Sequence, residues 1–186
     1  MPVTTPARER TRREIEQQAM ALFASRGYSA TSLQDIATAA GCSKATVLYH
    51  FNSKPAVLAA VLEPSHVALK ELLADVSALP AAAAQELAIS RFVDLAVQFR
   101  GLVHVLQDVL PTIEETPELA DLVQDGLRLT EFLAGSDDQL EIDIASFAIN
   151  GLLGECRHPG ERTDAELHQL CDTALHRLLR KPTRRP

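Results

Sequence analysis

Hydrogen-bonding side chains gather in the segment "SKATVLYH", residues 43–50, which follows a glycine. At helical spacing Lys44, Ala45, Thr46 and Tyr49 fall on one outward face. Lysine can donate to guanine or to a phosphate, the methyl groups of alanine and threonine can touch thymine methyls, and tyrosine can reach a phosphate. This chemistry suits duplex DNA.

A turn at Gly41 must position that face. Before the turn, Ile36, Ala37 and Ala40 recur at helical spacing, and Val47 continues the apolar face after it. Two short helices joined by a glycine-containing turn form a helix-turn-helix, whose second helix can enter the major groove of DNA. Two such helices also occur in ordinary bundles, so the pattern alone leaves both interpretations open.

Four helices are predicted in the first third of the chain. Gly27 and Gly41 end the first and second of them. The predicted starts are Pro6 for the first, Thr31 with Gln34 as a capping box for the second, Ser43 for the third and Ser53 for the fourth.

Pro64 interrupts the apolar stripe of the fourth helix. Because a proline removes one backbone hydrogen bond and restricts the preceding residue, we expect a kink or break between Leu62 and Ser65, then a further helix to about Ala78. The proline is also a candidate hinge. Later helices are predicted after Pro80 and over residues 102–110, 117–133, 137–155 and 164–179.

Composition indicates a mostly helical protein: hydrophobic residues make up 46% and aromatic residues 4% of the 186 positions. No run of about 18 apolar residues occurs and the N-terminus lacks an apolar signal core, so we expect a cytoplasmic protein with no membrane partner. Three cysteines without paired spacing are expected to be reduced thiols.

Charge is unevenly distributed along the chain. The formal net charge is −7, but residues 1–54 carry +3 and the remaining residues −10. Much of the positive charge comes from an arginine-rich arm at residues 8–13. A basic N-terminal part on an acidic chain favours DNA as the partner of the helix-turn-helix.

Residues 8–63 resemble the DNA-binding module of the tetracycline-repressor-type (TetR) family of bacterial regulators. The resemblance rests on "TSLQDIATAAGCSKATVLYHFNSKPAVLAAVLE" and on the preceding "ALFASRGYSATS". The family often has glycine at Ala45, tyrosine at Leu48 and an acid at Pro55, so the resemblance identifies the module but not the bases that this chain reads.

The resemblance implies that Ser43–Tyr49 form the recognition helix, that His50 and Phe51 help to seat it, and that Lys54 holds a phosphate. It also implies that the later helices form an effector-binding and dimerisation domain. The complete set of predicted DNA contacts is Thr31, Ser43, Lys44, Ala45, Thr46, Tyr49, His50 and Lys54.

The predicted fold is therefore all-α: a three-helix helix-turn-helix DNA-binding domain over residues 1–53 and a helical bundle for effector binding and dimerisation over residues 54–186. The predicted function is a ligand-responsive transcriptional regulator, a repressor released from a near-palindromic operator by a small molecule. The alternatives are an activator or a helical protein-interaction module on the same fold. No enzyme motif is present, such as a glycine-rich phosphate loop or a nucleophile elbow.

Two apolar features of the later helices predict a homodimer. One is the stripe from Leu167 to Leu179, and the other is the segment "LEIDIASFAINGLLGE", whose small residues allow close approach. The alternative is that both pack within one subunit.

A largely apolar effector is expected among aromatic side chains of this part of the chain. No cofactor is predicted, and no metal site, because the spacing of Cys156, His158, His168 and Cys171 matches no structural zinc pattern. The predicted ligand contacts are Phe92, Phe99, His104, Phe132, Phe147 and Asn150.

Overall fold

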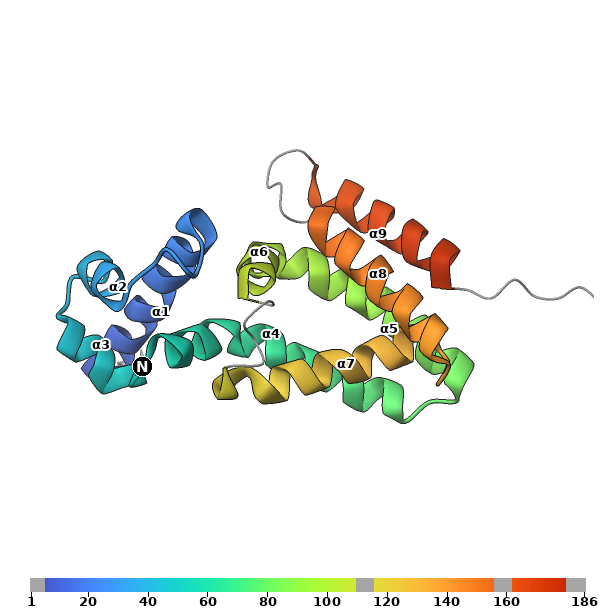
Figure 1. The fold of residues 1–186 in the computed structure, drawn as a ribbon, viewed down its shortest axis with the longest axis horizontal. Coiled ribbons are helices and arrows are strands. Elements are labelled where there is room, and N and C mark those ends of the chain that lie inside the picture. Colours follow the sequence, from blue (N-terminus) through green and yellow to red (C-terminus); the bar gives the residue numbers. More distant parts are fainter. Residues whose placement is uncertain (1–5, 110–115, 156–161, 180–186) are drawn as a thin grey trace, which may run out of the picture. The chain divides into compact units, whose positions relative to one another are not determined.

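The computed structural model describes residues 6–109, 116–155 and 162–179, except for the side chains of His104 and Gln107. Over these residues the chain is helical and contains no β-strand, which confirms the all-α prediction (Figure 1). Its elements are α1 (Ala7–Arg26), α2 (Leu33–Ala39), α3 (Lys44–Phe51), α4 (Lys54–Ser77), α5 (Ala81–Gln98), α6 (Arg100–Val109), η2 (Pro117–Leu119), α7 (Ala120–Ala134), α8 (Gln139–Glu155) and α9 (Asp164–Leu179).

The helices form two compact units. The head unit comprises Met1–Pro64 and Val105–Ala120, and the body unit comprises Ser65–His104 and Asp121–Pro186. Residues 105–109 and 116–120 belong to the head unit, with Val105, Val109 and Leu119 buried, and Asp108 Oδ2 accepts a 2.7 Å bond from the amide of Tyr28. The predicted functional division into residues 1–53 and 54–186 remains a prediction.

Apolar residues from α1, α2 and α3 form the core of the head unit. Ile36, Ala37 and Val47 are fully buried, as their spacing predicted, and Phe23 of α1 is buried with them. Full burial of side chains of this size stabilises a fold by about 1.5–3 kcal/mol each. The two helices of the predicted helix-turn-helix are therefore fixed against α1.

The predicted helix starts are confirmed at Ser43 and Ser53. Ser43 Oγ accepts the amide of Thr46 at 3.0 Å, and Ser53 Oγ accepts the amide of Ala56 at 3.1 Å. Gly27 ends α1 with a positive φ of 86°, a conformation that glycine adopts at little cost.

The prediction that Thr31 caps the second helix is wrong by one residue. Ser32 is the cap, and its reciprocal partner is Asp35 rather than Gln34. Thr31 is only 1% exposed, and its hydroxyl donates to the carbonyl oxygen of Gly27 at 2.8 Å. Because its side chain is buried, its predicted role as a direct DNA contact is corrected to a role in closing the loop before α2.

A break near Pro64 is also not observed, because α4 is one helix from Lys54 to Ser77 with the proline inside it. Buried side chains continue at helical spacing on both sides of the proline, at Val61, Leu62, His66 and Leu69. This continuous apolar stripe favours the helical conformation enough to offset the one hydrogen bond that a proline removes.

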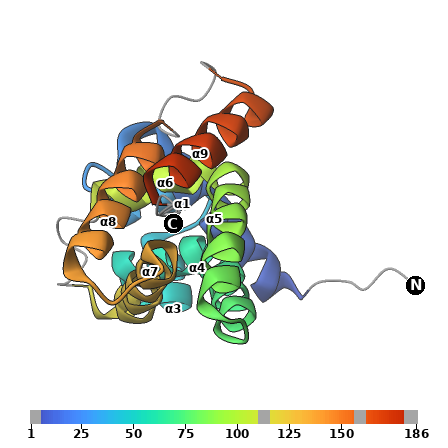
Figure 2. The same ribbon diagram turned by 90° about the vertical axis from the view of Figure 1, so that its right-hand side faces the viewer.

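In the body unit, α9 lies against α5 and α8 (Figure 2). One face of α9 joins the core of the body unit with 3% exposure or less, at Leu167, Cys171, Leu175 and Leu179. These four side chains are therefore covered within one chain, whereas Leu178 of the same helix is 57% exposed. The prediction that this helix takes part in a dimer interface remains a prediction.

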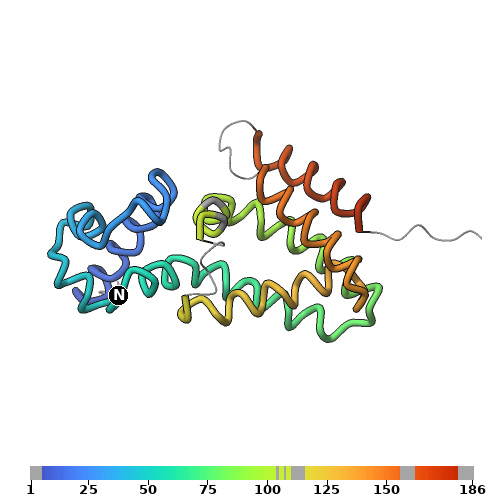
Figure 3. Tube along the Cα trace, viewed as in Figure 1, coloured from blue at the N-terminus to red at the C-terminus, as the bar shows by residue number. Residues whose placement is uncertain are grey.

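Gln85 of α5 bonds to the ends of two other helices of the body unit, α7 and α9. Figure 3 shows the Cα trace of these helices. Its Nε2 donates to the carbonyl oxygens of Leu133, at 2.9 Å, and Leu179, at 3.3 Å. These carbonyls lie in the last turns of α7 and α9, where no helical partner remains. Gly135 has a φ of 61°, and a Cβ at that position would lie 2.6 Å from Gln85, so glycine allows this close approach.

Two histidines of α9 face carboxylates of α5. Nε2 of His168 lies 3.0 Å from Asp94, and Nε2 of His176 lies 3.3 Å from Glu86. The pKa of His176 is raised above its ordinary value of 6.5, chiefly because its Nδ1–H donates to the backbone oxygen of Asp172; burial opposes this rise, and Glu86 adds to it.

These contacts predict a pH dependence of stability. A raised pKa in the folded state means that protonated His176 stabilises the fold fully below about pH 6.5, and that this contribution is lost as the pH rises through the folded-state pKa. His176→Gln should therefore lower the free energy of unfolding more at pH 6 than at pH 9. Urea unfolding followed by circular dichroism measures both values.

The exposed neighbour Arg177 provides the control, because Arg177→Gln introduces the same residue at the next position of α9. Its effect on stability should be the same at both pH values. An equal loss for His176→Gln at both pH values would contradict the assignment.

Candidate nucleic-acid interface

The turn between α2 and α3 is closed by backbone hydrogen bonds. Gly41 has a φ of 63°, and the amide of Cys42 donates to the carbonyl oxygen of Ala37 at 2.9 Å. Ser43 then starts α3, with its Oγ 2.8 Å from the hydroxyl of Thr46. The start and the direction of α3 are thus set by local bonds of the kind that the sequence predicted.

Most of the side chains predicted to face outward on α3 are exposed. Lys44, Ala45 and Tyr49 are exposed, Tyr49 to 67%, whereas Thr46 is half-buried beside Ser43. Val47 lies on the opposite face in the core. The outer face of α3 therefore presents an ammonium group, a methyl group and a phenol to solvent, with a hydroxyl at its edge.

The first turns of α1 contact the C-terminal end of α3. The guanidinium of Arg8 lies 5.4 Å from the centre of the Tyr49 ring, and that of Arg12 lies 4.6 Å from the centre of the Phe51 ring. Arg12 also donates to the carbonyl oxygen of His50 at 3.5 Å. Sequence reasoning missed these contacts because their residues lie about 40 positions apart, although the charge of the arm was noticed.

Lys54 bonds to its own chain. Its Nζ donates to the carbonyl oxygens of Tyr28 and Thr31, both at 2.9 Å, and lies 4.1 Å from the centre of the Tyr28 ring. Burial lowers the pKa of this amine, and nearby Asp108 opposes the decrease. Two of the three N–H donors of its ammonium group bond to the loop between α1 and α2. Its contact with a phosphate remains a prediction, in which the third N–H would be the donor.

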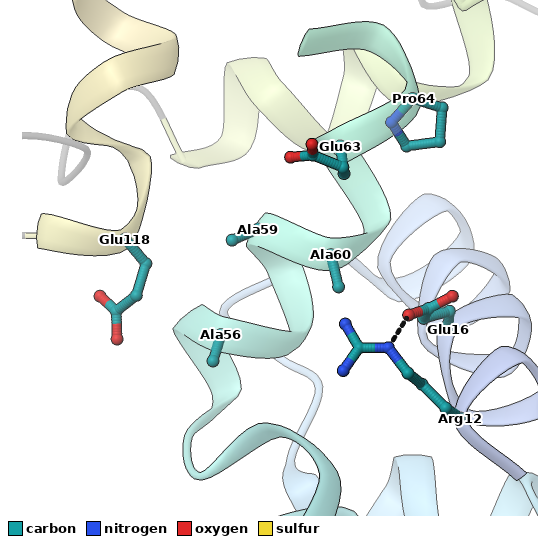
Figure 4. A pocket seen from close by; sticks show the side chains of 8 residues that line it. All are labelled: Arg12, Glu16, Ala56, Ala59, Ala60, Glu63, Pro64 and Glu118. Atoms are coloured by element: carbon teal, nitrogen blue, oxygen red, sulfur yellow. Dashed lines mark ion pairs between the residues drawn. The ribbon is translucent and has the colours of Figure 1, made fainter. Parts of the chain in front are cut away.

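A second face of the head unit is acidic. A cleft of about 490 Å³ runs along α4 between α1 and η2, with a floor of alanines at positions 56, 59 and 60 (Figure 4). Its carboxylates are Glu16, Glu63 and Glu118, and Arg12 bonds to the first at 3.0 Å. Burial raises the pKa of Glu16, and Arg12 opposes this rise. The excess negative charge makes this face unsuitable for DNA.

The described residues among the predicted ligand contacts differ in burial. Phe92 and Phe132 are half-buried against the core of the body unit, and Phe99 is half-buried at the end of α5. Phe147 is 81% exposed, because α8 buries its opposite face. Asn150 is exposed and donates to the carbonyl oxygen of Ser146.

The side chain of His104 lies outside the described part of the structure, as do Cys156 and His158 of the metal cluster that was considered. Among the described residues, no group of three or more His, Cys, Asp or Glu side chains is arranged to hold a metal ion. Over the same residues, no helix is long and apolar enough to cross a membrane.

A buried pair in the body unit was not predicted. Nε2 of His66 lies 2.9 Å from Oδ2 of Asp125, and both side chains are largely buried between α4 and α7. Their separation of 59 positions left no local sequence signal.

The two hydrogen bonds from Lys54 to the loop carbonyls predict that replacing this lysine lowers stability. Lys54→Met keeps a long apolar stem but removes the donors that satisfy two carbonyls, so we expect the free energy of unfolding to fall by about 1–3 kcal/mol. Lys70→Met, at an exposed position of α4, is the matched control and should change stability little. Equal urea midpoints for the two variants would show that the two hydrogen bonds of Lys54 do not stabilise the fold.

Comparisons with known proteins agree with this geometry. Residues 15–61 match the family described as "Bacterial regulatory proteins, tetR family". No curated protein matches the chain.

Several solved structures share the fold. A TetR-family transcriptional regulator from Bordetella parapertussis is 21% identical, with a TM-score of 0.70 over 90% of this chain and 93% of its own. The ketosteroid transcriptional regulator KstR2 of Mycobacterium tuberculosis is 17% identical, with a TM-score of 0.69 over 96% of this chain and 97% of its own. The transcriptional regulator FadR from Bacillus subtilis, in complex with stearoyl-CoA, is 19% identical, with a TM-score of 0.69 over 90% of this chain and 97% of its own.

These neighbours are transcriptional regulators rather than enzymes. The segment 15–61 is thus similar to the tetR family of bacterial regulatory proteins, and the chain has the all-α fold of solved TetR-family regulators, with an N-terminal helix-turn-helix.

Proposed function

We propose that this chain is a transcriptional repressor that binds a near-palindromic DNA site as a homodimer and is released from it by a small, largely apolar molecule. The observation that carries the proposal is the outer face of α3. It presents Lys44, Ala45 and Tyr49 to solvent from a helix that Ser43 caps and that Val47 anchors in the core.

Charge supports the choice of the helix-turn-helix as the DNA contact. Residues 1–54 carry a net charge of +3, whereas the rest of the chain carries −10 and repels a polyanion. A duplex is therefore attracted only to the basic part, where α3 lies. Phosphate contacts then set the register, and base contacts on α3 give sequence preference.

The test begins with selection of duplexes that the parent protein retains from a random pool and from fragments of its source genome. Lys44→Ala and Thr46→Ala should each change the preferred base at particular positions, with discrimination lowered by about 1–3 kcal/mol, roughly 5–150-fold. Fluorescence anisotropy on single-base variants of the selected site measures this.

Two matched controls lie in the body unit at exposed positions, Lys70→Ala and Thr173→Ala. Both should leave base preference unchanged. The proposal is wrong if the parent protein retains no duplex, or if it binds all sequences equally.

An apolar face of α8 supports self-association. Its exposed side chains recur every three or four residues and include one aromatic ring and one glycine: Leu140, Ile144, Phe147 and Gly151. At Gly151 a Cβ would meet nothing within 4 Å, so a second helix has room to approach. Exposed apolar stripes of this kind are typical of interfaces between protein chains. A two-fold arrangement would pair this face with itself.

Phe147→Arg should give monomers in sedimentation experiments, because a charge would be placed in the centre of the proposed interface. Monomers should bind a two-half-site operator more weakly than the parent dimer does. Leu127→Arg is the matched control, since Leu127 is 62% exposed on α7, and this variant should remain dimeric. Leu175 is unsuitable for such a test, because it is fully buried in the body unit.

A folded Phe147→Arg protein that remains dimeric would remove the α8 face from consideration. A monomeric parent that binds DNA would contradict the homodimer itself.

Release by an apolar molecule is supported by the half-buried rings of Phe92 and Phe132 in the body unit, and by the acyl-CoA bound to the neighbour from Bacillus subtilis. Such a ligand can act only through different affinities for two conformations, and a coupling of about 1–3 kcal/mol corresponds to a roughly 5–150-fold change in DNA affinity. Pro64 remains the candidate hinge. It lies inside α4, at the last residue of the first segment of the head unit.

A further inference from the structure

We propose that α1 and the C-terminal end of α3 together form a seat for one backbone phosphate of DNA, in which Arg8 is the cation and the Tyr49 ring is the platform that orients it. This inference rests on the proposed DNA-binding function and adds a contact on α1 to those expected on α3. It also changes the expected role of Tyr49, whose ring rather than its hydroxyl becomes the important part.

A cleft of about 390 Å³ lies at this place in the head unit. It is lined by Pro6, Arg8, Glu9, Arg12 and His50. The two arginines are four positions apart on α1, so they lie on the same face of the helix, one turn from each other. His50 approaches from α3, so the cleft joins the arm to the edge of the recognition helix.

The charges of the cleft leave one cation available. The carboxylate of Glu9 accepts from Arg13 at 3.1 Å, which neutralises it. Arg12 is paired with Glu16 and is also bonded to the carbonyl oxygen of His50. Arg8 has no carboxylate partner among the described residues, so the cleft attracts an anion through this residue.

The stacking geometry suits a phosphate. Arg8 lies 5.4 Å from the centre of the Tyr49 ring, and the His50 ring meets the same ring edge-on at 5.3 Å. A guanidinium held against an aromatic ring keeps the N–H groups of its edge free for a bidentate contact with phosphate oxygens. A neutral or charged imidazole can donate a further N–H.

The position of the cleft identifies the source of the phosphate. Tyr49 belongs to the exposed face of α3, and its ring also contacts Arg8, which lines the cleft. A duplex that accepts this face in its major groove brings the phosphates bordering that groove to the ends of the helix. The ligand is therefore a phosphodiester of the bound DNA, and a free anion in solution is the outcome that the test separates from it.

Arg8→Gln tests the seat on the highest-affinity duplex selected with the parent protein. Loss of one phosphate contact should make the slope of log affinity against log salt shallower by about 0.9 and weaken binding about fivefold at low salt. Base preference should stay as in the parent, because a phosphate contact carries no sequence information. Fluorescence anisotropy across a salt series measures both quantities.

Arg10→Gln is the matched control. It removes the same charge from the same exposed part of α1, but Arg10 does not line the cleft and lies about 200° around the helix from Arg8. Its affinity and salt slope should remain close to those of the parent. Equal effects of the two substitutions would overturn the seat and leave only diffuse attraction by the arm.

The platform is tested by Tyr49→Leu, alone and combined with Arg8→Gln. If the ring orients Arg8, each single variant should lose the same contact, and the double variant should have the salt slope of Arg8→Gln alone. Additive losses would overturn the platform.

Two further results distinguish failure of the phosphate seat from failure of the proposed DNA-binding function. If inorganic phosphate lowers DNA affinity equally in the parent and in Arg8→Gln, the seat binds a phosphate of DNA rather than a free anion. If it competes only with the parent, the assignment of the ligand to DNA is overturned. A parent protein that retains no duplex would reject the proposed function itself.

Discussion

The head unit depends on how the loop between α1 and α2 is held. Lys54 donates to two carbonyls of this loop from the start of α4, and Asp108 accepts an amide of the same loop from α6. A loop of six residues, 27–32, would otherwise leave several backbone polar groups without partners. Because Lys54 and Asp108 both bond to the backbone of the loop, they fix the orientation of α1 relative to α2. The turn at Gly41 then fixes the orientation of α3. The outer face of α3 is thus positioned by bonds that lie away from it.

Pairing within the arm decides where positive charge remains available. Of the arginines near the start of α1, Arg12 and Arg13 are paired with carboxylates one turn away, whereas Arg8 is held by an aromatic ring. A ring orients a cation without neutralising it. Arg8 therefore keeps its charge beside α3, whereas the charges of Arg12 and Arg13 are partly neutralised, a distinction that net charge alone does not contain.

Local signals in the sequence predicted local structure well. Helix periodicity gave the all-α fold, and the hydroxyl groups of Ser43 and Ser53 were recognised as caps because capping involves residues only three positions apart. The same signal failed at Thr31 because Ser32 follows it directly, and the reciprocal bond to Asp35 selects the second of the two. The contacts of Arg8, Lys54 and Asp108 join residues that are 23–80 positions apart and lie in different elements. A pattern of residues within one short stretch of sequence could not predict them.

Periodicity also could not decide which apolar stripe stays inside the body unit. Both α8 and α9 carry apolar faces, and the sequence predicted that both take part in a dimer interface. The structure buries one face of α9 in the body unit and leaves one face of α8 exposed. α9 needs a close neighbour, and α8 provides one by turning the small side chains of Ala145 and Ala148 inward. The larger side chains of α8, Leu140 and Phe147, then point to solvent. Leaving side chains of this size in water forgoes about 1.5–3 kcal/mol each, so close packing between α8 and α9 in one chain creates the apolar surface on which the proposed association of two chains depends.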